Sequence, residues 1–383
     1  MKLLIVSKCP THPTTAGNRW GTLAMTELFK QLGVDVHFLY VQEMPMRRSK
    51  APFEEDLQAT RAYWGDHFHL FKVSTRDKLR MNLLKLYRRL FCHWHYGVDD
   101  NYPYGLARVV NRLDRQHHFD ICIVNYIYLT RLFRYIHIPK QAVFTHDCMA
   151  YKDLKTGEKT HCITAHTEAV AAQRCKHIFV VQDQEAAYFS LIAPHSIVYN
   201  IYGRYTYLPT PPALNHVLLF LSGNNHYNQN GLRWFLAHIW PSVRQAFPDA
   251  RLLIGGGICS VVRGWTLPEG VELQGYVDDL AQFYAQGDIT INPTYQGTGL
   301  KIKTFEAIAY DKVTMVHPHS MAGVFRAEEA PIFSSTDPQQ WVARLQQLWG
   351  DPTQVRAIKA SNKDYLARMN AFIESEYKRF LQS

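Results

Sequence analysis

The stretch from Ile291 to Ala307, Ile-Asn-Pro-Thr-Tyr-Gln-Gly-Thr-Gly-Leu-Lys-Ile-Lys-Thr-Phe-Glu-Ala, is the most informative part of this chain. It reads as the end of an apolar strand, a loop with two glycines and two lysines, and a helix that carries Glu306. Glycines let backbone amides approach a ligand, lysines neutralise phosphate, and a helix start favours anions. A single carboxylate among these groups suits neutral hydroxyls, such as those of a ribose. The stretch therefore predicts a nucleotide site.

The composition is that of a folded protein that binds anions. Of the 383 residues 47% are hydrophobic and 20% are charged, and this length favours two domains. The net charge of +9 is compatible with anionic ligands, an anionic membrane surface or nucleic acid. Of these three, we do not expect nucleic acid to be a partner.

Cysteine usage and hydropathy indicate the compartment. The seven cysteines are scattered without a C-x-x-C pair, which is typical of reduced thiols in a cytosolic protein. We find no signal-peptide core and no apolar stretch near the ~20 residues of a membrane span. The expected location is the cytoplasm, with the inner face of the membrane as a docking surface.

Short apolar runs alternate with helical patterns along the whole chain. The expected strands are 2–7, 34–41, 67–73, 119–125, 142–145, 177–181, 216–221, 251–255, 271–273, 288–292 and 313–316. The expected helices are 20–32, 79–91, 104–116, 165–176, 230–246, 279–285 and 302–310, and the chain is helical after 337. This alternation of strand and helix predicts parallel, doubly wound α/β sheets.

A proline-containing break at 203–215 divides the alternation into two halves. We therefore expect an N-terminal domain at 1–202, a linker at 203–215, a C-terminal domain at 216–350, and helices at 351–383 that cross back to the first domain. The simplest architecture is two Rossmann-like domains facing each other across a cleft, with the ligand at the carboxyl ends of the strands.

Three further motifs accompany the opening stretch in the second half. They are Ser222-Gly223-Asn224-Asn225, the run from Pro248 to Gly257, and Leu273 to Leu280. In this order and spacing the segment from Leu218 to about Val324 closely resembles the nucleotide-binding half of group 1 glycosyltransferases of the GT-B fold. The resemblance implies transfer of a sugar from a nucleoside-diphosphate sugar to an acceptor hydroxyl, with retention and without a metal or other cofactor. The implied acceptor is a carbohydrate, glycolipid or glycoprotein of a cell-surface pathway.

The resemblance also implies roles for individual residues. Glu306 would hold the donor ribose, while Lys301 and Lys303 would pair with the diphosphate. Backbone groups would approach the phosphates at Gly223, Asn224, Gly299, Leu300 and Gly323, with Ala322-Gly323 presenting helix-start amides. A solvated loop remains the alternative for the lysines, and a dipole-complementing acid the alternative for Glu306.

Two features of this half are ambiguous. Many family members carry a glutamate where this chain has Thr298, so the role of that glutamate is unassigned. Gly255-Gly256-Gly257 is either a ligand contact or a turn that ends a strand.

The N-terminal half resembles the same enzymes more loosely. Gly17 lies in a loop after the first strand. In the family, this loop lies beside the donor phosphates or the acceptor. Thr145-His146-Asp147 resembles the family's Thr-His-Asp, whose histidine faces the donor sugar. We therefore expect His146 and Asp147 as catalytic residues beside Lys301, with a strand-end cap as the alternative for His146. Asp99-Asp100 and Asn125-Tyr126 are expected on the acceptor side.

A basic helix is expected between Arg76 and Arg89. Its cations Arg80, Lys85, Arg88 and Arg89 alternate with leucines, as in helices that dock on anionic bilayers. The alternative is a helix that packs its leucines inward.

Local spacing reveals no metal motif among the 19 histidines. In particular, His117-His118 lacks a third ligand at a sensible spacing.

Two other functions are compatible with the same fold. One is a sugar-nucleotide epimerase or hydrolase, which would need an acid/base pair near the sugar. The other is a non-catalytic nucleotide-binding subunit. A nicotinamide-dependent dehydrogenase is more distant, since no G-x-G-x-x-G follows the first strand.

Overall fold

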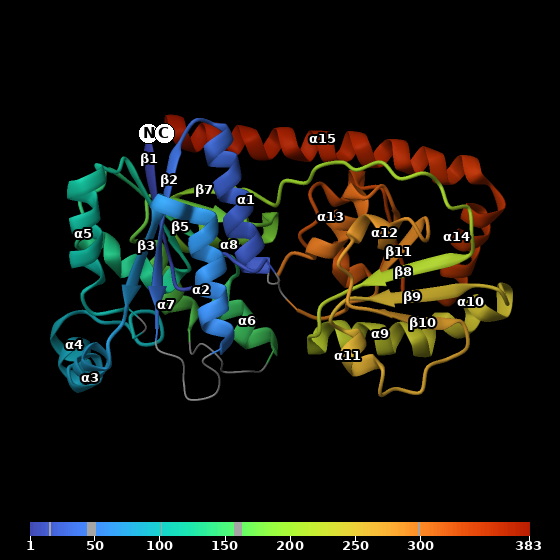
Figure 1. Cartoon of the computed structure of the whole chain (residues 1–383), viewed down its shortest axis with the longest axis horizontal. Coiled ribbons are helices and arrows are strands. Elements are labelled where there is room, and N and C mark those ends of the chain that lie inside the picture. The colour runs from blue at the N-terminus through green and yellow to red at the C-terminus, as the bar shows by residue number, and fades with distance from the viewer. Residues whose placement is uncertain (15–16, 44–50, 101, 157–162, 298) are drawn as a thin grey trace. The chain divides into compact units, whose positions relative to one another are not determined.

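The computed structural model describes residues 1–14, 17–43, 51–100, 102–156, 163–297 and 299–383. The chain divides into two compact units, one formed by Met1–Gly203 with Ile373–Ser383 and the other by Arg204–Phe372. Figure 1 labels the elements of both units.

Unit 1 contains a seven-stranded parallel sheet in the order β3-β2-β1-β4-β5-β6-β7. Its strands are β1 (Lys2–Ser7), β2 (Asp35–Gln42), β3 (Phe68–Lys72), β4 (Ile121–Asn125), β5 (Lys140–Phe144), β6 (His177–Val180) and β7 (Ile197–Asn200). Its helices are α1 (Gly17–Gln31), α2 (Ala51–Trp64), α3 (Thr75–Leu83), α4 (Lys85–Phe91), α5 (Leu106–His117), α6 (Met149–Thr156), α7 (Ala165–Ala172) and α8 (Asp183–Ile192), with 3-10 helices η1 (Gly65–His67) and η2 (Ile127–Arg134).

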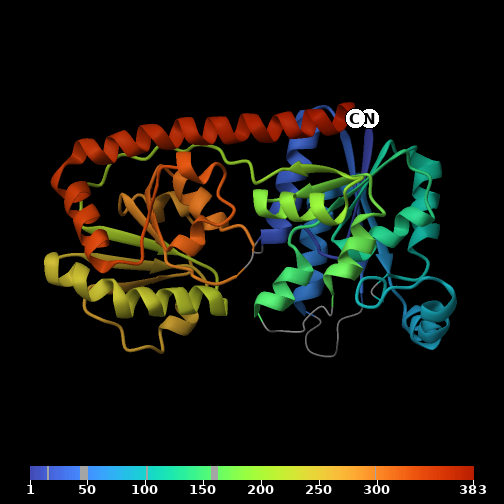
Figure 2. The same cartoon turned by 180° about the vertical axis from the view of Figure 1, so that it is seen from behind.

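Helices cover both faces of this sheet (Figures 1 and 2). Leu3 to Val6 of β1 are fully buried, which is why this interior strand reads as a continuous apolar run. Leu4 and Val6 pack in the core that α5, α7 and α8 close. On the α1 side, the ring of Phe29 lies 4.9 Å from that of Tyr377, near the C-terminus.

Unit 2 contains a six-stranded parallel sheet in the order β10-β9-β8-β11-β12-β13. Its strands are β8 (Val217–Leu221), β9 (Arg251–Gly255), β10 (Val271–Gly275), β11 (Ile289–Asn292), β12 (Val313–Val316) and β13 (Ile332–Ser334). Its helices are α9 (His226–His238), α10 (Trp240–Ala246), α11 (Cys259–Val262), α12 (Leu280–Tyr284), α13 (Ile302–Ala309) and α14 (Pro338–Gly350), with 3-10 helices η3 (Pro318–Met321) and η4 (Ala327–Glu329). The last helix, α15 (Pro352–Gln382), contributes residues to both units.

The core of unit 2 is built on both faces of its sheet. Large side chains of α9, α10 and α14, including Phe235, Trp240 and Trp341, fill one face. Phe283 and Tyr284 of α12 and Ala307 of α13 fill the other. The parallel α/β architecture predicted from the alternation is therefore confirmed, with one sheet in each unit.

Several elements differ from the expectation. The structure adds α2, α6, α8, α11, β7 and β13, and it splits two expected helices. The expected helix 79–91 is interrupted at Leu84, between α3 and α4. The expected helix 230–246 is interrupted at Ile239, where Pro241 occupies the first turn of α10 and supplies no backbone N–H.

Two further findings concern the cysteines and the hydropathy. The six described cysteines are free thiols, and Cys162 lies outside the described residues. Within the described ranges, no helix has the length and apolar character needed to cross a bilayer.

Candidate functional site

The carboxyl edge of the unit 2 sheet gathers most of the polar residues that the sequence singled out. Ser222 follows β8, Gly256 follows β9, and Thr294 follows β11. Helix α13 then begins at Ile302 and supplies Lys303 and Glu306 to the same edge. Carboxyl ends of adjacent parallel strands meet at one edge of a sheet, so the fold explains why segments so distant in sequence converge.

Lys303 is held by side chains from three segments. Its Nζ donates to Asn228 Oδ1 at 2.6 Å, to Thr294 Oγ1 at 3.1 Å and to Ser222 Oγ at 3.3 Å. Burial, with a smaller contribution from the charge of Lys301, lowers the pKa of Lys303 to about 7. Its three acceptors suit an ammonium group, so the site holds a cation whose charge is sensitive to its surroundings.

Lys301 lies at the N-terminus of α13 and folds back onto its own loop. Its Nζ donates to the carbonyl of Gly299 at 2.9 Å. Gly297 has φ +93, a backbone conformation that favours glycine, and its carbonyl lies 2.9 Å from His319 Nε2. Leu300 lies in the same loop, whereas Thr298 lies outside the described residues. Carbonyl contacts position this lysine beside Lys303.

Glu306 lies in a pocket of tyrosines. Its Oε1 accepts a hydrogen bond from the Tyr284 hydroxyl at 2.8 Å. Tyr284 and Tyr310 stack with ring centroids 4.6 Å apart. Burial raises the pKa of Glu306, and the Tyr284 hydrogen bond opposes that rise. The side chain is only partly buried, so its carboxylate can accept hydrogen bonds from a neutral ligand.

The two glycine motifs at this edge serve different purposes. A Cβ added at Gly256, which has φ +92, would lie 2.5 Å from the Ser222 carbonyl oxygen, so this glycine is required by packing. A Cβ at Gly223 would meet nothing within 4 Å, and this residue is exposed. The neighbouring Asn224 accepts from Gln229 Nε2 at 2.7 Å. The Gly223 turn is therefore open to a ligand.

One detail of the expected site is wrong. Ala322-Gly323 does not begin a helix: it forms a turn after η3, and η4 starts only at Ala327. Gly323 has φ +79, so its glycine is explained by the turn.

In unit 1, the carboxyl ends of β4 and β5 carry two strained aromatic residues. Tyr126 has φ 69 and His146 has φ 60, and their ring centroids are 4.7 Å apart. Positive φ at a non-glycine residue costs about 1–3 kcal/mol and tends to occur at functional sites.

The imidazole of His146 is partly buried, and its Nε2 atom is shielded from solvent. Its centroid lies 3.7 Å from that of Phe144, and burial lowers its pKa to about 3. Its Nε2 has no hydrogen-bond partner among the described residues. Desolvating a polar nitrogen without a partner is unfavourable, so this nitrogen is a good candidate for contact with a ligand.

The other expected residues of unit 1 have mixed surroundings. Asp147 accepts from Lys152 Nζ at 2.8 Å, and Gly17 is the exposed first residue of α1. Asp99 is fully buried and paired with Arg174 at 2.6 Å and Arg131 at 3.1 Å. It is a structural ion-pair centre, and its expected place on the acceptor side stays a prediction.

Sequence reasoning missed two residues that organise the unit 2 edge. Asn228 on α9 accepts from Lys303 and donates from Nδ2 to the Gly223 carbonyl at 2.9 Å. Tyr284 on α12 orients Glu306. Neither has a distinctive local pattern, although a polar residue in the first turn after a glycine loop was a usable signal for Asn228.

Comparisons with known proteins agree with this geometry. Residues 215–351 match the family model described as glycosyl transferases group 1. No curated protein matches the chain by sequence.

Solved structures resemble the whole chain. Sucrose-phosphate synthase from Thermosynechococcus elongatus has a TM-score of 0.68 at 14% identity, covering 100% of this chain and 98% of its own. HepE of Anabaena in complex with UDP has a TM-score of 0.65 at 13% identity, covering 100% of both chains. The pneumococcal O-GlcNAc transferase GtfA, with UDP and GlcNAc, has a TM-score of 0.65 at 10% identity, covering 100% and 99%.

The two parallel-sheet units and these structural relatives define the GT-B fold. Residues 215–351 match the group 1 glycosyl transferase domain, and this match identifies that part of the chain as a glycosyltransferase domain. The predicted class of enzyme is thereby confirmed.

Proposed function

We propose that this enzyme transfers a sugar, with retention, from a nucleoside-diphosphate sugar to an acceptor hydroxyl in the synthesis of a cell-surface glycoconjugate. The donor nucleotide that we favour is UDP, because HepE and GtfA were solved with it. In this proposal Glu306 binds the ribose hydroxyls, and Lys301 and Lys303 bind the diphosphate.

One observation carries the proposal: α13 presents Lys303 and Glu306 on the same edge, three residues apart. Residues three apart on a helix are neighbours on its surface. The cation is held by Ser222, Asn228 and Thr294, and the carboxylate by Tyr284. A diphosphate needs a cation, and the neighbouring ribose needs a hydrogen-bond acceptor a short distance away.

The chemistry follows from these charges. The bond between the anomeric carbon and the diphosphate oxygen breaks, and negative charge grows on the departing diphosphate, where Lys301 and Lys303 stabilise it. The acceptor oxygen bonds to the anomeric carbon on the same face, and its proton passes to the departing diphosphate. His146, neutral by burial, would donate or accept a hydrogen bond at a sugar hydroxyl. No metal is required in this scheme.

A ligand panel tests the proposal. UDP, GDP, ADP, dTDP and CMP are compared by thermal shift, since ligand binding to the folded state raises its stability. We expect stabilisation by UDP, none by CMP, and loss of the UDP effect in Glu306→Ala. Glu272→Ala is the matched control. This glutamate lies near the start of β10, at the opposite end of the strands from the candidate site, and it is paired with Arg251 of β9. Equal UDP stabilisation of Glu306→Ala and the wild type would contradict the proposal.

Donor turnover separates transfer from the alternative functions. UDP-sugar is incubated with and without an acceptor mixture. Transfer that depends on acceptor supports the proposal. Rapid donor conversion without acceptor would indicate an epimerase or hydrolase, and binding without any turnover would indicate a non-catalytic subunit.

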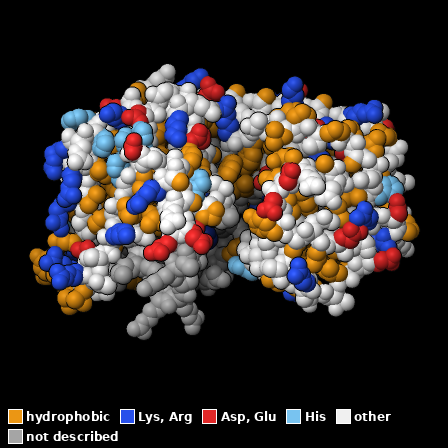
Figure 3. Space-filling view, viewed as in Figure 1, with side chains coloured by type: hydrophobic (Ala, Val, Ile, Leu, Met, Phe, Trp, Pro, Cys, Tyr) orange, Lys and Arg blue, Asp and Glu red, His pale blue; other side chains and the backbone are white. Residues whose placement is uncertain are grey.

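We further propose that α3 and α4 dock on an anionic membrane that carries a lipid-linked acceptor. Their large apolar side chains face outward: Leu83 is 72% exposed, Leu90 66% and Phe91 69%. Figure 3 shows hydrophobic and basic side chains together over α3 and α4, at the lower left. The described cations are Arg76, Arg80 and Arg88, whereas the side chains of Lys78, Lys85 and Arg89 lie outside the described part. The outward leucines argue against the alternative of an inward-packed helix.

Vesicle co-sedimentation tests this docking. We expect binding to vesicles that contain phosphatidylglycerol and none to pure phosphatidylcholine, with each nearby cation contributing about 1 kcal/mol. Leu83→Ser with Leu90→Ser should abolish the binding, whereas Leu191→Ser, a change at an equally exposed leucine of α8, should not. Binding that is unchanged in the double variant would overturn the docking proposal.

A further inference from the structure

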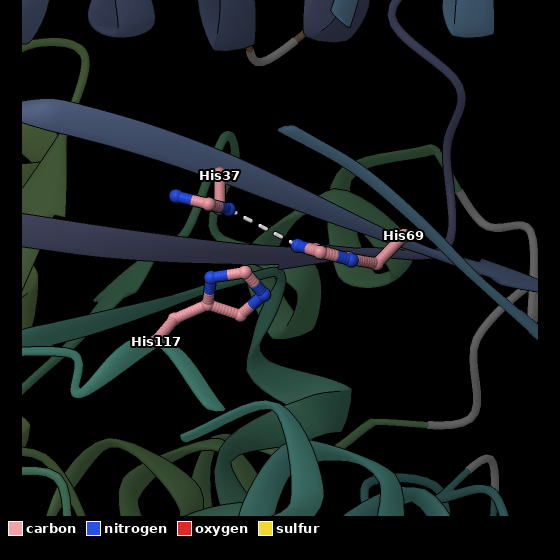
Figure 4. Close-up of side chains that lie close together, drawn as sticks. All are labelled: His37, His69 and His117. Atoms are coloured by element: carbon pink, nitrogen blue, oxygen red, sulfur yellow. Dashed lines mark hydrogen bonds between the residues drawn. The ribbon is translucent and has the colours of Figure 1, made fainter. Parts of the chain in front are cut away.

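Three histidines from different elements meet at the amino end of the unit 1 sheet. His37 lies near the start of β2, His69 near the start of β3, and His117 is the last residue of α5. Figure 4 shows the three rings turned toward a common point, with a hydrogen bond between His37 and His69. Tyr126 and His146 follow the carboxyl ends of strands in the same sheet, so this cluster lies at the end opposite to the candidate site.

The nitrogens are close enough to share one ion. His37 Nδ1 and His69 Nε2 are 3.1 Å apart, and one ligand atom from each of the three residues lies within 4.8 Å of the others. Two nitrogens bound tetrahedrally at the usual Zn–N length are about 3.3 Å apart. The first pair already has this spacing. His117, partly buried at a helix end, supplies the third nitrogen within 4.8 Å of the other two.

A carboxylate stands behind the cluster. Asp35 Oδ2 is 3.6 Å from His37 Nε2, the ring nitrogen that faces away from His69, and Asp35 Oδ1 is 2.9 Å from His67 Nε2. Histidines that bind a metal commonly direct their other ring N–H to a carboxylate, which fixes the tautomer and the ring orientation. Asp35 is placed to do this for His37.

Burial favours the neutral form of two of these imidazoles, His37 and His69. Burial, followed by the charges of the neighbouring histidines, lowers the pKa of His69 to about 4. Burial and the charge of His67 likewise lower the pKa of His37. A structural role could explain one hydrogen bond between two rings, but it does not require a third ring at the same point.

We propose that His37, His69 and His117 bind a zinc-class transition-metal ion, with a water molecule in the fourth position. Neutral imidazole suits Zn²⁺, Cu²⁺ and Ni²⁺. The ion joins β2, β3 and α5, and therefore stabilises unit 1 without entering the sugar transfer. Sequence spacing missed the site because the other two ligands, His37 and His69, lie on strands far from His117 in the chain.

Metal binding by the purified, metal-stripped chain tests the proposal. Equilibrium dialysis against ZnCl₂ should give one equivalent of zinc, and Co²⁺ in its place should give the intense visible bands of a four-coordinate site. Zinc should raise the unfolding temperature by about 5 °C or more when it is well above its Kd. His69→Ala and His117→Ala, both at partly exposed positions, should lose the bound equivalent and the thermal shift.

A matched variant and a competing site complete the design. His195→Ala changes an exposed histidine of the same unit and should retain the metal. No saturable equivalent in the wild type, or equal binding by wild type and His69→Ala, would overturn the proposal. His67 forms a second group with Asp35 and His37. Loss of zinc in His67→Ala alone, with retention in His69→Ala and His117→Ala, would also overturn the assignment.

Discussion

The carboxyl edges of the two sheets hold different kinds of groups. In unit 2, the charged Lys303 and Glu306 are each fixed by hydrogen bonds from other segments. In unit 1, Tyr126 and His146 are aromatic, in contact, and held at positive φ. The first edge fixes charged groups in place. The second stores backbone strain around His146 Nε2, which has no hydrogen-bond partner within the described part of the chain. We infer that the unit 2 edge supplies the free energy of donor binding, while the unit 1 edge acts on the sugar.

The largest effect is expected at the unit 2 edge. Lys303→Met removes the cation that stabilises the departing diphosphate, so turnover should fall by about 10²–10³-fold. Initial rates at saturating donor measure this change. Lys363→Met, at an exposed position on α15, is the control and should retain full turnover. If both variants have the same turnover, the unit 2 edge does not stabilise the charge of the departing diphosphate.

The glycines of the same edge should differ in stability. Gly256→Ala forces a Cβ against the Ser222 carbonyl at φ +92, and we expect a loss of about 2 kcal/mol in the free energy of unfolding. Gly223→Ala introduces a Cβ into open space and should cost little. Urea unfolding of the two variants provides the comparison. Similar losses in both would show that the packing argument for Gly256 is wrong.

A change in unit 1 should alter turnover without altering donor binding. Asparagine tolerates positive φ, so His146→Asn keeps the backbone while removing the imidazole. We expect turnover to fall about tenfold, as for loss of one hydrogen bond to a reacting group, with an unchanged Kd for UDP. Calorimetry and initial rates measure the two quantities. A rise of about tenfold in the Kd for UDP would show that the unit 1 edge also contributes to donor binding.

The smallest effect concerns pH. The pKa of Lys303 is lowered to about 7 in the free protein, and a bound diphosphate raises it again. The complex therefore holds more protons than the free protein above pH 7, so UDP affinity should fall as pH rises, by about fivefold between pH 7 and 8. In Lys303→Arg, whose charge persists at these pH values, the decline should disappear. A wild-type affinity for UDP that is constant between pH 7 and 8 would contradict this prediction.

The sequence predicted the fold better than its details. Buried strands such as Leu3 to Val6 are continuous apolar runs, so the parallel sheets were visible. β13 has only three residues and α2 is a weakly amphipathic helix, so neither gave a clear signal. The break at Ile239 depends on the placement of Pro241, which helix periodicity alone does not weigh.

The candidate site was predictable only where its functional residues lie close together in the sequence. Lys301, Lys303 and Glu306 lie in one short segment with glycines, whereas Asn228 and Tyr284 join them only through the sheet topology. The same holds for the histidine cluster, whose members come from β2, β3 and α5. Contacts between distant segments have no signature in a single sequence.

A crystal structure of the enzyme with UDP tests the central claim most directly. We predict ribose hydroxyls within hydrogen-bond distance of Glu306 and a diphosphate against Lys301 and Lys303, at the carboxyl edge of the unit 2 sheet. A nucleotide bound elsewhere, or one that leaves both Glu306 and Lys303 without contact, would contradict the account.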